Sequence, residues 1–301
     1  AGRFVCGKIW QGKTFIGSSM LRSMYSGISA MKSNQTKMDV VGNNVANVGT
    51  TAYKKTSTRF ADALYQSSIY PSAPTATSGG VNPGQVGIGV KVSGILKNMV
   101  QGSLQTTGRD TDLAIDGDGF FTVEIGPNQK GYTRDGSFSL DMNGNLVTSQ
   151  GYKVLGEGDN PILIPEEVEN ANGVNQKVVS FNIASDGSIS YLLADGTKMP
   201  QLDVDGAVIK GDKQVLQISV FQNDEGLEQL GGNIYGETAN SGEPIKNPVF
   251  GKITQGAIEM SNVDLSEEFT EMIVTTRAFQ AASKVITTSD ELLQEIVNLK
   301  R

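Results

Sequence analysis

Four aspartates crowd into one short stretch and are the first candidates for chemistry. Asp110, Asp112, Asp116 and Asp118 lie in RDTDLAIDGDGF, where carboxylates could bind calcium or act as an acid pair. An EF-hand loop needs the pattern D-x-[DN]-x-[DN]-G and a glutamate at its twelfth position. DGDG has the wrong spacing and lacks that glutamate. We therefore interpret the stretch as a solvated turn in a β domain and predict no metal site.

The amino-acid composition excludes most other kinds of catalytic site. The 301 residues include no histidine, which excludes the usual general base and the His-based triads. Cys6 is the single cysteine, so the sequence holds neither a disulfide framework nor a cysteine-rich zinc site. A glycosidase-type carboxylate pair stays open because there are 32 acidic residues, but their spacing singles out no two. We predict a protein that is not an enzyme and has no cofactor or small-molecule substrate.

The net charge and hydropathy of the chain limit the kinds of partner that it can bind. The net charge is −7 and the sequence pI is about 4.8, so a phosphate backbone would be repelled and nucleic acid is not an expected partner. No apolar run approaches the roughly 18–20 residues that span a bilayer. Residues 1–19 precede Met20 and lack the apolar run of a signal peptide, so we expect an upstream extension or an expression remnant. Cys6 and the only tryptophan, Trp10, lie there and carry no functional weight.

The stretch VVGNNVANVGTTAYKK, residues 40–55, gathers three asparagines at the end of a predicted helix. Asparagine is neither an acid, a base nor a nucleophile at neutral pH, so its role there is contact rather than catalysis. Only four charged residues lie between Leu21 and Val48, which predicts protein on several sides of this helix. Its heptad stripe contains Leu21, Met24, Ile28, Met31, Gln35, Met38, Gly42 and Val45.

A second long helix is predicted at the other end of the chain. Ser261 or Asn262 can cap it, and about 38 residues follow without proline or glycine. Such a pattern is typical of coiled-coil packing. An antiparallel hairpin in one ordinary domain is an alternative. Because some 200 residues separate the two helices, we favour paired terminal helices with a β domain inserted between them.

The middle of the sequence is β and loop. Residues 66–94 are rich in Ser, Pro, Gly and Thr and predict an extended connection that functions or hinges. Beyond them, short alternating segments such as KVSGIL and DLAIDGDGFFTVEI stand between turn pairs, which predicts an antiparallel β domain. The turn pairs are Asp135-Gly136, Asn143-Gly144, Asp186-Gly187 and Asp195-Gly196.

Four segments, in order along the chain, carry specific motifs. The first helix ends in the pattern D-x-x-x-N-N-x-A-N, from Asp39 to Asn47, and a T-x-x-[YF]-[KR] run ends at Lys54. The next two segments are TGRDTDLAIDGDGFF and YTRDGSFSLDMNGNLVTSQGY, and the last is SNVDLSEEFTEMIVTTRAFQAASKVITTSDELLQEIVNL. These segments resemble, in order, the N-terminal helix, the first β-domain segments and the C-terminal helix of the bacterial flagellar rod and hook family. The resemblance covers nearly all of the chain from Met20 to Arg301.

The resemblance implies an α+β axial protein that polymerises into a hollow helical tube. Terminal helices would form an inner coiled-coil layer, and the antiparallel β domain would lie outside it. Export through the flagellar type III apparatus, without a cleaved signal, is implied as well. Further implied partners are other axial proteins of the rod, the hook cap and the junction between hook and filament. Short hook proteins of Gram-positive bacteria are most similar, so a flexible hook subunit is favoured, with the rigid distal rod as the alternative.

The expected domain organisation and interface follow. We expect an extension at 1–19, an N-terminal helix at 20–50, an extended Gly/Ser-rich connector at 51–94, a β-rich outer domain at 95–255 and a C-terminal helix at 256–301. Apolar side chains would pack within and between subunits, and the asparagines would form a joint between subunits. The predicted assembly residues are Leu21, Met24, Ile28, Met31, Met38, Asn43, Asn44, Val45, Asn47, Phe269, Met272, Phe279, Ile286, Leu293 and Ile296.

Two other classes remain open from the sequence. An acidic glycan-binding or glycan-cleaving β domain would need clustered aromatic and carboxylate side chains in a pocket. A secreted coiled-coil adhesin would bind a surface without polymerising.

Overall fold

A computed structural model describes residues 6–75, 79–127, 129–169, 175–202, 208–210, 213–245 and 250–299. The chain divides into two compact units. The helix unit comprises Ala1–Ala46, Thr56–Lys97 and Asp264–Arg301, and the β unit comprises Asn47–Lys55 and Asn98–Val263. A long helix stands at each end, and an antiparallel β-rich region is inserted between them, which confirms the predicted α+β class.

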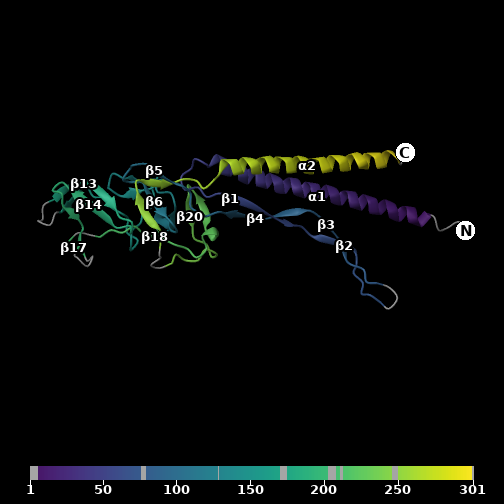
Figure 1. The fold of residues 1–301 in the computed structure, drawn as a ribbon, viewed down its shortest axis with the longest axis horizontal. Coiled ribbons are helices and arrows are strands. Elements are labelled where there is room, and N and C mark those ends of the chain that lie inside the picture. The colour runs from purple at the N-terminus through teal and green to yellow at the C-terminus, as the bar shows by residue number, and fades with distance from the viewer. Residues whose placement is uncertain are drawn as a thin grey trace. The chain divides into compact units, whose positions relative to one another are not determined.

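The helix unit is built on two antiparallel helices, α1 (Cys6–Ala46) and α2 (Leu265–Asn298), which lie side by side (Figure 1). Helix α1 begins at Cys6, well before the expected start at Met20. The N-cap of α2 is Asp264, whose carboxylate accepts from the backbone amides of Ser266 and Glu267. The predicted caps, Ser261 and Asn262, were wrong: a carboxylate at this position also complements the helix dipole.

The connector forms two antiparallel ribbons. Strand β1 (Thr56–Asp62) pairs with β4 (Val90–Lys97), and β2 (Tyr65–Ile69) pairs with β3 (Gly84–Gly87). The first ribbon packs on α1, where the backbone amide of Val90 donates to Ser29 Oγ at 3.3 Å. The extended connector is therefore hydrogen-bonded along much of its length, and α1 has α2 on one side and the ribbon on another.

The β unit contains one eight-stranded antiparallel sheet and several smaller ones. The main sheet runs β19-β20-β8-β7-β11-β10-β9, with β18 also on β7, and a second sheet runs β12-β13-β14-β15. The remaining pairs are β21-β6, β22-β5 and β16-β17. Strand bounds are β5 Leu104–Thr106, β6 Leu113–Asp116, β7 Phe120–Gly126, β8 Gln129–Thr133, β9 Ser139–Leu140, β10 Leu146–Val147, β11 Lys153–Val154, β12 Glu167–Glu169, β13 Asn175–Ile183, β14 Ile189–Leu193, β15 Lys198–Met199, β16 Gln201–Leu202, β17 Val208–Lys210, β18 Ile218–Ser219, β19 Glu228–Gly231, β20 Ile234–Gly236, β21 Lys252–Gln255 and β22 Ala257–Glu259; a 3₁₀ turn covers Asp224–Gly226.

Two apolar clusters hold the β unit together. The larger one gathers aliphatic side chains from most strands around the edge-to-face pair of Phe121 and Phe138, whose ring centroids are 5.2 Å apart. The smaller one contains Phe120, Tyr132 and Phe221 in edge-to-face contacts, with Tyr235 also against Phe120. These side chains are almost fully buried, so the β unit has a complete core of its own.

Three of the four predicted turn pairs lie in turns, whereas Asp135-Gly136 lies in an irregular segment without one. Gly144 (φ +82°), Gly187 (φ +82°) and Gly196 (φ +78°) occupy left-handed positions in the predicted turns. Asp116 and Asp118 flank Gly117 in the turn between β6 and β7 and are exposed, as the turn interpretation predicted. In the part of the chain that the structure describes, no helix is both long enough and apolar enough to cross a lipid bilayer.

Candidate assembly helices and a buried polar cluster

The most deeply buried residues of α2 are small or polar. The buried residues of α2 are Glu268, Thr275, Ala282 and Ser289, which recur every seven residues. Ser289 Oγ lies 3.3 Å from Ser23 Oγ of α1. This spacing is the coiled-coil repeat, but the residue types are not the large apolar ones that usually fill it.

Gly27 of α1 marks the close approach of the two helices. A Cβ added at Gly27 would lie 3.0 Å from Ile286 Cγ1 and 3.3 Å from the carbonyl oxygen of Ala282. Glycine and alanine therefore let the backbones come together where a larger side chain would separate them. Close backbone contact, rather than interlocked leucines, sets this part of the seam.

The predicted apolar residues differ in how deeply the single chain buries them. Met24, Met31, Met38, Val45, Met272, Phe279, Ile286 and Leu293 are half-buried. Leu21, Ile28, Phe269 and Ile296 are exposed, although Ile296 follows the seven-residue spacing of the buried line. Met272, Phe279, Ile286 and Leu293 each lie four residues after a buried residue of α2, which is the spacing of the second coiled-coil position. Of these, Ile286 lies against Gly27 of α1. Their packing between copies stays a prediction.

Asn44 joins three elements of the helix unit. Its side chain is buried, and its amide nitrogen donates to the carbonyl of Thr56 at 2.8 Å and to Glu268 Oε2 at 3.1 Å. Its amide oxygen accepts from the backbone amide and the hydroxyl of Thr56, both at 3.1 Å. Asn44 therefore fixes the end of α1 to the start of β1 and to α2, because a carboxamide can donate and accept at once.

The three asparagines differ in burial within one chain. Asn43 is exposed, whereas Asn47 accepts from the Thr50 hydroxyl at 3.1 Å in the turn after α1. Asn44 is the buried one of the three, and the joint between subunits stays a prediction. Nearby, Lys37 Nζ lies 3.2 Å from a carboxylate oxygen of Glu271 and adds a partly exposed ion pair between the helices.

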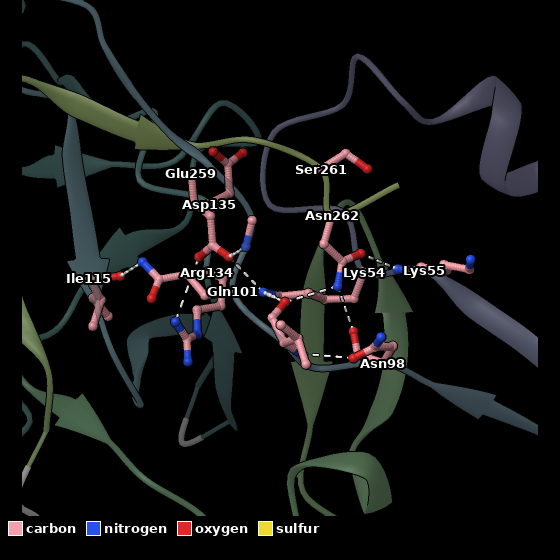
Figure 2. Close-up of polar contacts among 12 residues, drawn as sticks. Lys54, Lys55, Asn98, Gln101, Ile115, Arg134, Asp135, Glu259, Ser261 and Asn262 are labelled. Carbon is pink, nitrogen blue, oxygen red and sulfur yellow. Dashed lines mark hydrogen bonds and ion pairs between the residues drawn. The ribbon is translucent and has the colours of Figure 1, made fainter. Parts of the chain in front are cut away.

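A buried polar cluster, which we call the Lys54 cluster, lies in the β unit and contains Lys54, Arg134 and Glu259 (Figure 2). Lys54 Nζ is 2.6 Å from Glu259 Oε1 and donates to the carbonyl of Val100 at 3.0 Å. The same carboxylate oxygen accepts from the backbone amide of Gly102 at 2.8 Å. Three segments far apart in the sequence are thereby held around one carboxylate.

Arg134 completes the cluster. Its NH1 group lies 3.6 Å from Glu259 Oε2 and donates to the carbonyl of Gly117 at 2.7 Å. The guanidinium also lies 5.1 Å from the ring centroid of Phe120, where the aromatic face attracts a cation. Arg134 therefore links the charged cluster directly to the smaller apolar core.

Asn262 ties the same segments through the backbone. Its side chain accepts from the amide of Lys55 at 2.7 Å and donates to the carbonyls of Asn98 and Val100, both at 2.9 Å (Figure 2). The residue predicted as a helix cap is thus a bridge between strand-end segments. The segments at 52–55, 98–102 and 259–262 are also those where the chain passes from the β unit into the helix unit along the backbone.

Burial dominates the electrostatics of the Lys54 cluster. Desolvation lowers the pKa of Lys54 from its ordinary value of 10.5, and the neighbouring Glu259 carboxylate opposes that shift. Removing one partner of such a pair leaves an uncompensated buried charge, which typically costs about 3–5 kcal/mol. The cluster therefore fixes the geometry of its three segments, whatever it adds to net stability.

Only weak signals in the sequence point to this cluster. Lys54 lies in the T-x-x-[YF]-[KR] run, but nothing there pointed to a buried partner. Glu259 and Ala257 lie on the same, buried side of β22. An acidic residue that alternates with a small apolar one in a short strand was the sequence signal for a buried charge. In the described ranges, no group of three or more His, Cys, Asp or Glu side chains is placed to hold a metal ion. The described contacts of the cluster bind and position backbone rather than a reacting group.

Comparisons with known proteins cover both ends and the middle of the chain. The model for flagella basal body rod protein matches residues 24–54, the flagellar hook protein FlgE/F/G D1 domain matches 114–191, and the flagellar basal body rod FlgEFG protein C-terminal domain matches 254–299.

Relatives align over most of the chain. The flagellar basal-body rod protein FlgG of Bacillus subtilis is 46% identical, over 94% of this chain and 100% of the relative. FlgG of Borreliella burgdorferi is 38% identical over the same shares. The flagellar hook protein FlgE of Borreliella burgdorferi is 28% identical over 93% of this chain and 100% of the relative. That last alignment extends over 442 residues, more than this chain contains.

Proposed function

The chain belongs to the bacterial flagellar rod and hook family, and from this premise we propose that it is a structural subunit that polymerises into a hollow helical tube. Proteins of this family are located in the flagellum, outside the cytoplasm after export, and this chain shares that location. Its proposed partners are further copies of itself, other axial proteins of the rod, the hook cap and the hook–filament junction, and the type III export apparatus. The proposed role is mechanical and not enzymatic.

The observation that carries the proposal is the outer patch of α2, which we define as Phe269, Ile273 and Val274. These side chains are 50%, 62% and 59% exposed. On α1, Leu21, Tyr25 and Ile28 are exposed as well. Large apolar side chains are unusual on the exposed side of a helix whose buried residues are small or polar. Full burial of each is worth about 1.5–3 kcal/mol, so contact between copies would be strongly favoured.

A tube requires contacts that do not close on themselves. When one surface of a subunit binds a different surface of the next, repeated contacts generate an open helical polymer. The exposed apolar residues of α1 and the outer patch of α2 are different surfaces, so they suit contacts of this kind. Of the predicted assembly residues, Phe269 lies in the outer patch, and Leu21 and Ile28 are among the exposed apolar residues of α1.

Within the family, we favour the rod over the hook. The sequence analysis favoured a flexible hook subunit, but relatives named as rod protein FlgG align at similar length and higher identity than the hook relative. The first connector ribbon supports the same choice, because β1 and β4 are paired along their lengths and packed on α1. A hydrogen-bonded ribbon is stiffer than the compliant joint that a bending hook would use. The hook remains the second candidate, on the similarity of TGRDTDLAIDGDGFF and SNVDLSEEFTEMI to short hook proteins.

Electron microscopy of the concentrated full chain tests the polymer. Tubes or short filaments are the expected result, whereas stable monomers that bind sugars or cell surfaces would favour the glycan-binding or adhesin readings. Antibody labelling of isolated flagellar basal structures then separates the two positions. We expect label along the rod; label confined to the hook would contradict the rod assignment and leave the family role intact.

A further inference from the structure

A groove of about 920 Å³ opens in the β unit, away from the Lys54 cluster. It is lined by segments of β8, β18 and β19 and by residues 243–245. Lys130 on its wall is 2.6 Å from Asp159 and is therefore already matched by one carboxylate. The groove is strongly acidic, because its lining carboxylates are Glu157, Asp159, Glu228, Glu237 and Glu243.

The same groove is partly apolar. Leu230 and Ile245 are 50% and 46% exposed, and Phe250 lines the groove beside them. A small inorganic cation would leave these side chains in water, whereas a polypeptide segment with both cationic and apolar side chains would cover them. The lining therefore favours a polypeptide segment that carries both cationic and apolar side chains.

A strand edge borders the groove. The main sheet ends at β19, which pairs with β20, and all four residues of β19 are exposed. An edge strand offers backbone donors and acceptors that an extended chain can match. The edge therefore favours an extended polypeptide over a helix.

The chain itself carries such a segment. The β unit has 12 basic and 23 acidic residues, and the helix unit has 13 basic and 9 acidic residues, so the two carry net charges of −11 and +4. On the β1-β4 ribbon, Arg59 and Lys91 are exposed beside the exposed apolar residues Phe60 and Ile95. The ribbon thus presents the chemistry that complements the groove.

We propose that the acidic groove of the β unit binds the β1-β4 ribbon of a second copy of this chain, through Arg59 and Lys91. The contact rests on the proposed function, since it joins subunits of the polymer. It adds a charged outer contact to the apolar contacts of the helices. Because it depends on exposed charges, salt weakens it more than it weakens the apolar contacts.

A charge-swap cycle in the full chain tests the contact. One variant carries Glu228→Lys with Glu243→Lys, a second carries Arg59→Glu with Lys91→Glu, and a third combines all four. The matched control, Glu166→Lys with Glu225→Lys, changes the net charge equally at exposed acids outside the groove. We expect each double reversal to raise the critical concentration for polymerisation about tenfold or more, equivalent to about 1.4 kcal/mol, and the combination to restore it.

The possible outcomes distinguish the groove contact from the proposed function. If both double reversals polymerise like the unaltered chain, or the combination is no better than either, the groove contact is refuted while the proposed function stands. An unaltered chain that never polymerises would overturn both.

Disulfide cross-linking is a second test, because it reports which residues of two copies come close together and does not depend on how charge reversals affect folding. In a Cys6→Ser background, Glu228→Cys with Lys91→Cys should give disulfide-linked ladders on polymerisation. Glu166→Cys with Lys91→Cys should not. Equal ladders from both pairs, or none from the first in a chain that polymerises, would contradict the contact.

Discussion

The β unit and the helix unit bury their side chains in opposite ways. In the β unit, Phe121 and Phe138 lie fully inside a core drawn from many strands. In the helix unit, the buried line along α2 is Glu268, Thr275, Ala282 and Ser289, while Phe269 on the same helix is half exposed. One unit buries an apolar core drawn from many strands, and the other leaves large apolar side chains exposed along its helices. We therefore expect contact between copies to add more apolar packing to the helix unit than to the β unit.

The largest effect we expect is unfolding of the β unit at alkaline pH. Burial raises the pKa of Tyr132, Tyr191 and Tyr235 from 10.0 to about 12. The unfolded chain loses these protons near pH 10 and the folded chain keeps them, so their stabilisation is full below pH 10 and is lost as pH rises toward about 12. Each contributes at most about 2–3 kcal/mol.

Circular dichroism and tyrosinate absorption, followed together against pH, check this expectation. The strand signal should persist below about pH 10 and fall as the three buried tyrosines ionise toward about pH 12. Strand loss that precedes ionisation of the buried tyrosines would show that another group controls the transition.

The Lys54 cluster should be the next most sensitive feature. Lys54→Met leaves Glu259 buried beside Arg134 alone and should lower the free energy of unfolding of the β unit by about 3–5 kcal/mol. The matched control is Lys130→Met, which removes a pair whose side chains are 38% and 53% exposed and should cost less than about 1 kcal/mol. Denaturant titration of both variants measures the difference. Equal losses of unfolding free energy in the two variants would show that burial does not make the Lys54 pair more important for stability than the exposed Lys130 pair.

Two phenylalanines compare the units directly. Phe121→Ala should destabilise the β unit by about 3–5 kcal/mol, because it opens a cavity in a closed core. Phe269→Ala should change monomer stability by less than about 0.5 kcal/mol and act on polymerisation instead. Thermal unfolding at low protein concentration distinguishes them. A large loss of monomer stability in Phe269→Ala would show that the outer patch is packed within one chain.

Two neighbouring asparagines give the smallest contrast. Asn44→Ala removes four hydrogen bonds and leaves Thr56 and Glu268 with fewer partners, at an expected cost of about 1–3 kcal/mol in the helix unit. Asn43→Ala, at an exposed position one residue earlier, should cost much less. Hydrogen exchange of the amides at the end of α1 reports both. Similar hydrogen-exchange protection in the two variants would contradict the bridging role of Asn44.

Some of this organisation could be predicted from the sequence, because it follows local rules. The charge-poor helix before Asn44 and the Asp186-Gly187 and Asp195-Gly196 turns are encoded within a few residues. The cap of α2 was misassigned because Ser261, Asn262 and Asp264 are all capable residues, and only the tertiary contacts of Asn262 decide among them.

The candidate sites were harder to predict for two physical reasons. The Lys54 cluster assembles from residues as far apart as Lys54 and Glu259, and no local pattern marks a long-range ion pair. The seam of the helix unit uses Gly27, Ala282 and Ser289, whose small side chains give no hydrophobic period. Met272, Phe279, Ile286 and Leu293 do give one, and the prediction therefore named these residues and not the small ones.

The critical concentration for polymerisation of Phe269→Ser with Ile273→Ser, compared with the unaltered chain by sedimentation, tests the central claim most directly. Each replaced side chain would otherwise bury about 1.5–3 kcal/mol of apolar contact between copies, so the critical concentration should rise roughly 100-fold or more. The stability of the β unit should stay unchanged. A double variant that polymerises at the same concentration as the unaltered chain would contradict the account that the outward apolar residues of α2 build the tube.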